Sequence, residues 1–181
     1  MKKIISNVTT PLRKYPIAGI SILLFVIMAL FVPKFFTAKN LATVGAQLSY
    51  VGISATGMAF ILIGGGMDIS TGTAMSLSGI LSGLVMAQIT SGWSTVAGVA
   101  VVLGAGIACG ALNGFFVAKL RVNSFMMTLI TQMAFMGAAL WLTNSKSVTG
   151  IPEAYVSLGS VKVWGIPISL FLLLAFFILG Q

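Results

Sequence analysis

The residues that could do chemistry are few, and the most unusual of them lie in the glycine-rich segment 64–72. Asp68 and Ser70 follow three consecutive glycines there, and Asp68 is one of only two acidic residues, the other being Glu153. We expect the glycines to end one helix. The side-chain oxygens of Asp68 and Ser70 can then cap the next helix, because such oxygens accept hydrogen bonds from unpaired N–H groups in a first turn. A carboxylate is also favoured by the positive end of the helix dipole. A role for Asp68 in gating or in a subunit contact is the alternative.

The composition excludes most catalytic chemistry. The chain has no histidine and one cysteine, Cys109, within an apolar run, which excludes an internal disulfide and an ordinary His/Cys metal site. No pair of carboxylates lies within the hydrophobic stretches to act as acid and base. The glycine run lacks the Gly-Lys-Ser/Thr ending of a phosphate loop. We therefore predict no catalytic residue, no metal and no cofactor bound by this chain, and no enzyme.

Several polar side chains fall within the hydrophobic stretches and need partners there. Gln132 lies near the middle of one stretch, where an unpaired amide is costly, so it must face protein or water. An interhelical hydrogen bond and a place on a substrate pathway are both open to it. The other polar residues of this kind are Thr43, Gln47, Tyr50, Ser54, Asn113, Thr128 and Thr131.

The elements that carry these residues are membrane helices. Only 7% of the 181 residues are charged, 58% are hydrophobic, and the mean hydropathy is +1.10. A soluble domain carries about 25% charged residues, so this surface must face lipid. The formal charge of +8 could suggest nucleic acid. The basic residues are scattered thinly among predicted loops, however, which favours membrane anchoring and no nucleic acid.

Six stretches are long and apolar enough to approach a span of about 20 residues. They cover residues 17–32, 41–63, 72–89, 96–118, 124–142 and 163–180. They are apolar all round, whereas barrel strands would alternate apolar and polar residues. The sequence therefore predicts an all-α, polytopic membrane helix bundle of about six helices, in a single domain over residues 1–181.

The basic residues predict the orientation in the membrane. A cytoplasmic N-terminus places Lys2, Lys3, Arg13, Lys14, Lys119 and Arg121 in the cytoplasm, against Lys34, Lys39, Lys146 and Lys162 on the other side. The first stretch resembles a signal peptide, but it is too long and lacks a small-residue cleavage site, so we expect an uncleaved span.

Small residues recur at four-residue spacing in two stretches. Gly106, Gly110 and Gly114 do so in the fourth, as do Gly79, Gly83 and Ala87 in the third. Small residues on one face let membrane helices approach closely, which predicts helix packing at these positions. A dimer interface or a lined pathway is the alternative.

The glycine-rich segment also carries a family resemblance. Gly65-Gly66-Met67-Asp68-Ile69-Ser70-Thr71-Gly72 resembles the Gly-Gly-Ile-Asp-Leu-Ser-Val-Gly signature of ribose-type, sugar-importing ABC transporter permeases. Residues 33–41, 113–122, 125–129 and 143–145 are similar to further family segments in the same order, so the resemblance extends from about Pro33 to Ile168. One departure is Asn123-Ser124, which stands where the family usually has a proline, so the fifth helix could start differently.

The resemblance implies a permease subunit in the bacterial cytoplasmic (inner) membrane. Its partners would be ABC ATPase subunits that consume ATP, a periplasmic or lipid-anchored sugar-binding protein, and a second permease subunit, identical or different. The family is longer, so we expect this chain to be the N-terminal portion, without the C-terminal half and the segment that contacts the ATPase. From polarity and depth, we select Gln47, Tyr50, Thr128 and Gln132 as candidates for the substrate pathway.

Two other functions remain open at this stage. A secondary transporter coupled to protons would place ionisable residues within its helices, whereas Asp68 lies at a helix boundary. Backbone carbonyls could still bind sodium, so a sodium-coupled transporter is one alternative. A non-transporting membrane fragment is the other. The sequence does not select among ribose, galactose, xylose and related sugars or nucleosides.

Overall fold

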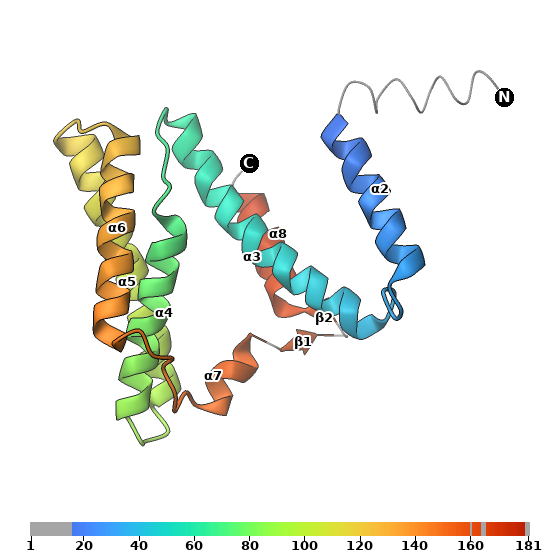
Figure 1. The fold of residues 1–181 in the computed structure, drawn as a ribbon. Helices are drawn as coiled ribbons and strands as arrows, with labels where there is room; N and C mark the ends of the chain where they lie inside the picture. The colour runs from blue at the N-terminus through green and yellow to red at the C-terminus, as the bar shows by residue number, and fades with distance from the viewer. Residues whose placement is uncertain (1–15, 160, 164–165, 180–181) are drawn as a thin grey trace. The chain divides into compact units, whose positions relative to one another are not determined.

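The long apolar stretches form α-helices in the computed structural model, which describes residues 16–159, 161–163 and 166–179. A backbone surrounded by hydrocarbon has to satisfy its own hydrogen bonds, and a helix does so within one segment. In chain order the elements are α2 (Pro16–Phe31), α3 (Ala38–Ile63), α4 (Thr71–Gln88), α5 (Ser94–Gly114), the π-helix η1 (Phe115–Lys119), α6 (Ser124–Thr143), α7 (Glu153–Leu158), β1 (Lys162–Val163), β2 (Ile166–Pro167) and α8 (Ile168–Leu179) (Figure 1). The all-α fold class is confirmed.

The chain divides into two units, Met1–Gly45 and Ala46–Gln181. In the first unit an aromatic cluster fixes the turn after α2. The rings of Phe25, Phe35 and Phe36 meet edge to face, with centroids 5.2 to 6.2 Å apart. Asn40 then donates from its side chain to the Phe35 carbonyl at 2.7 Å, and Thr37 accepts from the Asn40 N–H at 3.4 Å. These bonds satisfy the start of α3.

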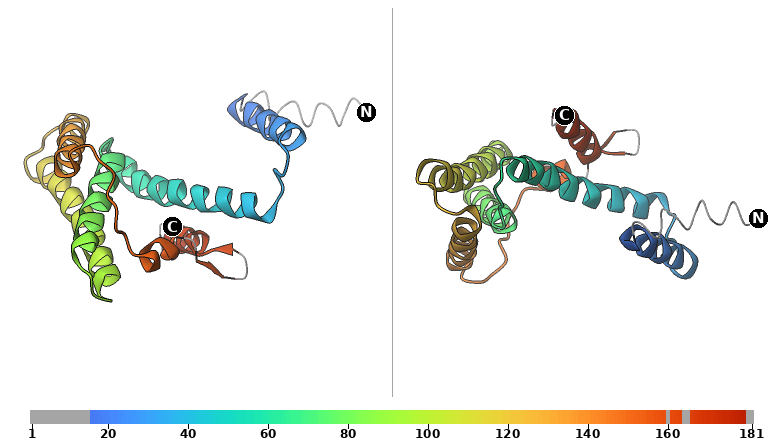
Figure 2. Two further views of the ribbon diagram at one scale, coloured as in Figure 1. Left: turned by 60° about the horizontal axis from the view of Figure 1, so that its bottom comes forward. Right: turned by 90° about the horizontal axis from the view of Figure 1, so that it is seen from above.

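The second unit is built on a bundle of three helices, in which α4 packs against both α5 and α6 (Figures 1 and 2). Its core consists of Leu77 from α4, Cys109 from α5, and Phe135 and Ala139 from α6. Near the other end of α4, the Ser82 hydroxyl donates to the Gly98 carbonyl of α5 at 2.8 Å. This bundle positions the segment that the sequence singled out.

Three of the described helical segments are long and apolar enough to cross a membrane: Ala38–Ile63, Ser94–Lys119 and Ser124–Thr143. The helices Pro16–Phe31 and Ile168–Ile178 are apolar but shorter. The sequence predicted about six spans, so α4 is the notable difference. It matches the expected stretch 72–89 closely, but it carries serines and threonines and buries five residues. Because α5 and α6 cover it, α4 does not need a continuously apolar surface.

The prediction for the last stretch, 163–180, is wrong at its start. Val163 lies in β1, which pairs antiparallel with β2, and the helix begins only at Ile168. Pro167 explains the difference, since proline has no N–H to donate and restricts the preceding residue, Ile166, to extended backbone. The predicted end at Gly180 lies outside the described residues.

Candidate functional site

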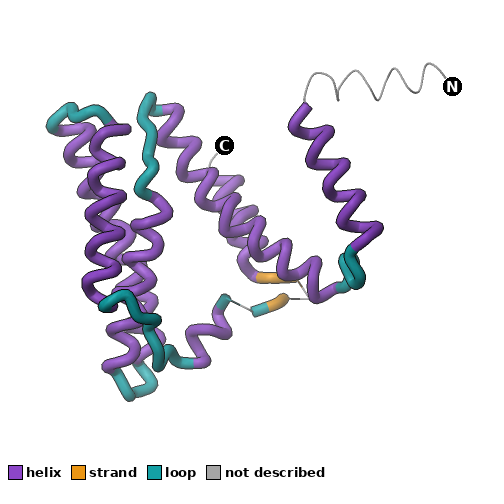
Figure 3. The backbone as a smooth tube through the Cα atoms, in the orientation of Figure 1, coloured by secondary structure: helices purple, strands orange, loops and turns teal. Residues whose placement is uncertain are grey.

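The connection between α3 and α4, residues 64–70, is called the join below. It consists of a sharp turn followed by a segment of extended backbone. The Gly66 N–H donates to the Ile61 carbonyl at 2.9 Å, and Gly65 adopts a φ of +76°. An L-residue pays a steric cost in this left-handed region, so the turn requires glycine. After it, the chain runs extended beside α6 before α4 begins at Thr71 (Figure 3). The glycine run ends α3 as the sequence predicted.

Two hydroxyls at the start of α6 hold this extended segment. The Met67 N–H donates to Ser124 Oγ at 3.1 Å, and the Ile69 N–H donates to Thr128 Oγ1 at 3.4 Å. Asn123 caps α6 by accepting from the Met126 N–H at 3.2 Å. The residues that replace the family's usual proline therefore begin the helix with a side-chain cap, and they also supply one contact to the join.

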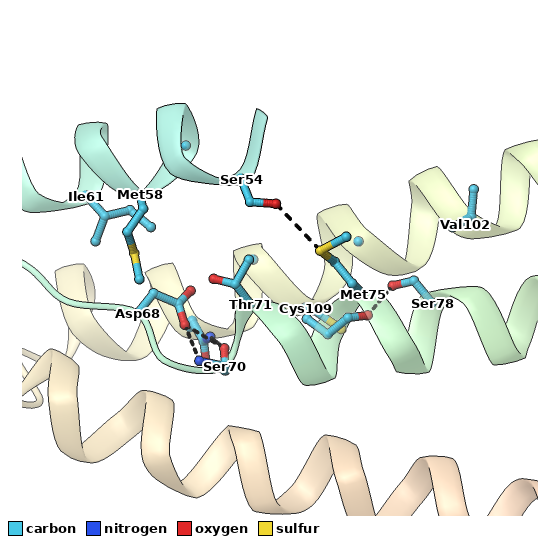
Figure 4. Close-up of a pocket in the computed structure, with 15 residues that line it drawn as sticks. Ser54, Met58, Ile61, Asp68, Ser70, Thr71, Met75, Ser78, Val102 and Cys109 are labelled. Carbon is cyan, nitrogen blue, oxygen red and sulfur yellow. Dashed lines mark hydrogen bonds between the residues drawn. The ribbon is translucent and has the colours of Figure 1, made fainter. Parts of the chain in front are cut away.

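A chain of hydrogen bonds ties the same segment to α5. The Asn113 amide donates from Nδ2 to Ser70 Oγ at 2.8 Å, and the Ser70 hydroxyl donates to Asp68 Oδ1 at 2.7 Å. Asp68 Oδ1 also accepts the Ser70 N–H at 2.7 Å. Ser70 is 1% exposed and Asn113 is 6% exposed. The two segments that carry most of the family resemblance thus meet directly, although they lie 43 residues apart (Figure 4 shows the Asp68–Ser70 bonds).

The predicted capping role is only partly correct. Ser70 occupies the N-cap position of α4, but its side chain makes no capping bond, and its backbone is helical, with φ −83° and ψ −11°. Asp68 satisfies the N–H of Ser70 rather than an N–H of the first turn. The reason is that the Ser70 hydroxyl is already engaged by Asp68 and Asn113.

One polar atom of this network lacks a partner. Asn113 Oδ1 is buried and accepts no hydrogen bond from the described residues. A buried acceptor left unpaired costs about 1–3 kcal/mol. The Asn113 amide nitrogen therefore holds Ser70, while a hydrogen bond to its oxygen has to come from outside the described residues.

A cavity of about 430 Å³ opens beside the network, between residues 54–61 of α3 and the helices α4 and α5 (Figure 4). Asp68, Ser70, Thr71 and Asn113 form its polar end. The rest of its wall comes from Ser54, Gly57, Met58, Ile61, Ala74, Met75, Ser78, Val102, Gly106, Cys109 and Gly110. Small residues predominate in this wall, and their lack of bulk leaves the space open.

The polar end of the cavity lies within the length of the helical run 94–119 rather than beyond its end. Asn113 precedes the end of the continuous helical run at Lys119 by six residues, or about 9 Å at 1.5 Å per residue. Asp68 lies at a helix boundary, as the sequence predicted, and that boundary lies beside the last turn of α5, which η1 continues, and the first turns of α6. Irregular backbone at such depth is tolerated only where protein covers it or where it lines a water-filled cavity.

The four residues predicted for the substrate pathway do not come together. Gln47 and Tyr50 are exposed on α3, and Gln132 is half-buried on α6. Thr128 is 2% exposed, and its hydroxyl donates to the Ser124 carbonyl at 2.9 Å while it supports the join. None of the four lines the cavity. Their pathway role stays a prediction, and the described geometry brings Asp68, Ser70 and Asn113 together instead.

The predicted packing glycines occupy different environments. Gly106 and Gly110 lie on the cavity wall, and a Cβ added at either, or at Gly79 or Gly114, would meet no described atom within 4 Å. A Cβ at Gly83 would lie 3.1 Å from the Val148 side chain. Gly72, at the start of α4, also has open space. The tightest approach on α5 is at Gly98, which lies two four-residue steps before Gly106 and was not among the predicted packing glycines.

Comparison with known proteins identifies relatives of this chain among transport permeases. Residues 40–180 match the family described as "Branched-chain amino acid transport system / permease component". The chain is 32% identical to the L-arabinose transport system permease protein AraH of Escherichia coli over 90% of this chain and 48% of AraH. It is 33% identical to the Ribose import permease protein RbsC of E. coli, over 73% of this chain and 40% of RbsC. It is 32% identical to the Xylose transport system permease protein XylH of E. coli, over 69% of this chain and 31% of XylH.

The matched regions cover only part of each relative. The chain spans less than half the length of each of them. No solved structure matches it. The family match nevertheless covers well over half of the chain, from α3 to α8, and includes every residue of the network and its cavity. This chain therefore belongs to the permease-component family that includes the arabinose, xylose and ribose permeases.

Proposed function

We propose that this chain is a membrane-spanning permease subunit of an ATP-driven importer for a monosaccharide. The observation that carries the proposal is the similarity to permease proteins named for arabinose, xylose and ribose transport, over up to 90% of the chain. The family description names branched-chain amino acids instead, which makes an amino acid importer the second candidate. In either case the chain contributes helices to the translocation path and performs no covalent chemistry on the substrate.

The join supports a transport role on physical grounds. In transporters, irregular backbone that lies among the membrane helices and lines a cavity commonly contributes to the substrate site. Ionisable residues within the membrane likewise mark substrate pathways by default. Here the irregular backbone that connects α3 to α4 carries Asp68 to the wall of a cavity about 430 Å³ in volume. We assign this part of the chain to the path.

The proposal implies partners and a location. ATP hydrolysis takes place in separate ATPase subunits, a sugar-binding protein delivers the substrate, and a second permease subunit completes the path. The complex lies in the bacterial inner membrane with the N-terminus in the cytoplasm, as the distribution of basic residues predicts. A reporter fused after Lys119 should then show cytoplasmic activity and one fused at Glu153 should not; the reverse pattern would overturn this orientation.

A chimera tests the transport function directly. The segment of AraH that matches this chain is replaced by the chain itself, in a host that lacks AraH but retains its partner proteins. We expect uptake of at least one of L-arabinose, D-xylose and D-ribose, dependent on ATP and insensitive to collapse of the sodium gradient. Intact AraH is the positive control.

Three outcomes separate the candidates. Uptake of leucine, isoleucine or valine without sugar uptake would favour the amino acid importer. Uptake that stops when the sodium gradient collapses, but persists without ATP, would favour a sodium-coupled transporter. No uptake of any substrate, with the chimera present in the membrane at the level of AraH, would contradict the transport proposal altogether.

A further inference from the structure

We infer that the cavity between α3, α4 and α5 binds a neutral, polyhydroxylated ligand through Asp68 and Thr71. The inference rests on the proposed function, and it adds the site and the chemical class that the site selects. Monosaccharides are such ligands: their hydroxyl groups donate and accept hydrogen bonds, and their C–H faces are apolar. The cavity offers both kinds of surface.

The polar end of the cavity has hydrogen-bonding capacity to spare. Asp68 Oδ1 accepts from both the N–H and the hydroxyl of Ser70, whereas its second oxygen, Oδ2, has no partner among the described residues. The Thr71 hydroxyl, one residue beyond Ser70 on the same wall, likewise makes no hydrogen bond within the described part of the chain. Figure 4 shows Asp68, Ser70 and Thr71 gathered at one end of the cavity. Hydroxyl groups of a ligand can donate to the carboxylate and bond to the threonine.

The network behind Asp68 fixes its direction. The N–H and the hydroxyl of Ser70 both donate to one carboxylate oxygen of Asp68, and the Asn113 amide donates to the Ser70 hydroxyl. All three hydrogen bonds measure between 2.7 and 2.8 Å. The carboxylate is therefore oriented before a ligand arrives. A pre-oriented acceptor loses less conformational freedom on binding than a mobile one. Ser70 and Asn113 are positioning residues in this scheme.

The remainder of the cavity suits the apolar face of a sugar ring. Met75, Val102 and Cys109 line it, and Gly106 and Gly110 leave open space where other residues would place a Cβ. Its volume of about 430 Å³ falls within the range of about 300–1,000 Å³ that is usual for small-molecule sites. The cavity is therefore large enough for one monosaccharide with accompanying water.

The charge of the lining selects against anions. Asp68 is the only charged residue among those that line the cavity. A sugar acid, a phosphorylated sugar or the carboxylate of an amino acid would meet this charge with no lysine or arginine to offset it. Like charges at close range in a low-dielectric site repel strongly. A neutral ligand pays no such penalty, so the lining favours sugars over the amino acids that the family description names.

Cys109 provides a built-in probe, because it is the only cysteine of the chain and lies on the cavity wall. The full chain is reconstituted in liposomes, and the rate of its alkylation by membrane-permeant N-ethylmaleimide is measured by mass spectrometry. We expect L-arabinose, D-xylose or D-ribose to slow the alkylation in a saturable manner. Ribonate and leucine should leave the rate unchanged. If Cys109 reacts too slowly, Gly106→Cys in a Cys109→Ser background reports on the same wall.

Substitutions at the polar end then identify the contacts. Asp68→Ala should raise the half-protecting sugar concentration by about tenfold or more, and Thr71→Val by about threefold, as expected for loss of a charged and a neutral hydrogen bond respectively. Glu153→Gln and Thr56→Val are matched controls, because neither residue lines the cavity. Both should leave the protection unchanged.

The results also separate this inference from the transport proposal. Absence of protection by every sugar, equal protection by ribonate, or protection by sodium or leucine alone would each overturn the inference. If the AraH chimera imports a sugar that fails to protect Cys109, the site is wrong and the transport function stands. Protection by a sugar that the chimera does not import would instead support the site and contradict the transport function.

Discussion

Replacement of Gly98 by alanine tests the packing of α4 against α5. A Cβ at this position would lie 2.6 Å from Met86 Cγ and closer still to the sulfur, and Met86 is 2% exposed. Carbon atoms pack at about 3.5–4.0 Å, so Met86 has to move within an enclosed space. Overpacking of this kind costs about 1–3 kcal/mol. The substitution also gains about 1 kcal/mol of helix propensity, which partly offsets the cost.

Gly106→Ala in the same helix is the matched control. Its Cβ meets no described atom within 4 Å, so it gains the helix propensity without the clash. The difference between the two variants therefore isolates the overpacking, and we expect Gly98→Ala to be less stable by about 1–3 kcal/mol. Unfolding by sodium dodecyl sulfate in mixed micelles, followed by tryptophan fluorescence, measures both.

A second comparison identifies the responsible contact. In a Met86→Ala background the clash is absent, so Gly98→Ala should there behave like Gly106→Ala. The coupling between the two positions would amount to about 0.5–3 kcal/mol, as is usual for residues in direct contact. Equal stability of the two glycine variants in the original background, or a difference that survives Met86→Ala, would refute the packing of α4 and α5 described above.

Three further predictions concern the join. Gly65→Ala should lower the unfolding free energy by about 1–2 kcal/mol relative to Gly64→Ala, because only Gly65 has a positive φ; the same denaturation assay decides it, and equal stability would contradict the turn. Asn113→Leu should leave the unfolding free energy unchanged or higher, because it removes a hydrogen bond worth about 0.6 kcal/mol together with an unpaired oxygen that costs about 1–3 kcal/mol. Asn113→Asp should instead lower the unfolding free energy by at least about 1 kcal/mol, because it adds a second buried carboxylate. Ser124→Ala should speed hydrogen exchange at the Met67 amide, with Thr56→Val as a control; an unchanged rate would mean that this hydroxyl does not hold the join.

The helices were predictable because hydrophobicity decides them locally. The predicted stretches 41–63 and 124–142 differ by three residues or fewer from α3 and α6. The prediction failed at Val163, because Pro167, the last residue of β2 and the residue directly before α8, interrupts an otherwise apolar run. It also gave no hint that α5 continues as a π-helix from Phe115 to Lys119, since that change depends on hydrogen-bond spacing rather than on residue type.

The site was only partly predictable. The sequence identified Asp68 and Ser70 as unusual and Asn113 as a polar residue that needed a partner, but polarity and depth then favoured Gln47, Tyr50, Thr128 and Gln132. Polarity shows that a side chain needs a partner, whereas only the packing shows which partner it has. Thr128 illustrates the difference, because its hydroxyl supports the backbone of Ile69 instead of facing the cavity.

By itself the sequence determined that this is an all-α membrane protein, that it has no histidine and a single cysteine, and which family it resembles. These properties follow from composition and from short local motifs, which act residue by residue. Only the tertiary structure brought Asn113 to Ser70, opened the cavity next to Asp68, and placed the tight glycine contact at Gly98. These contacts join residues far apart in the chain, so they depend on how α4, α5 and α6 pack and cannot be read from local spacing.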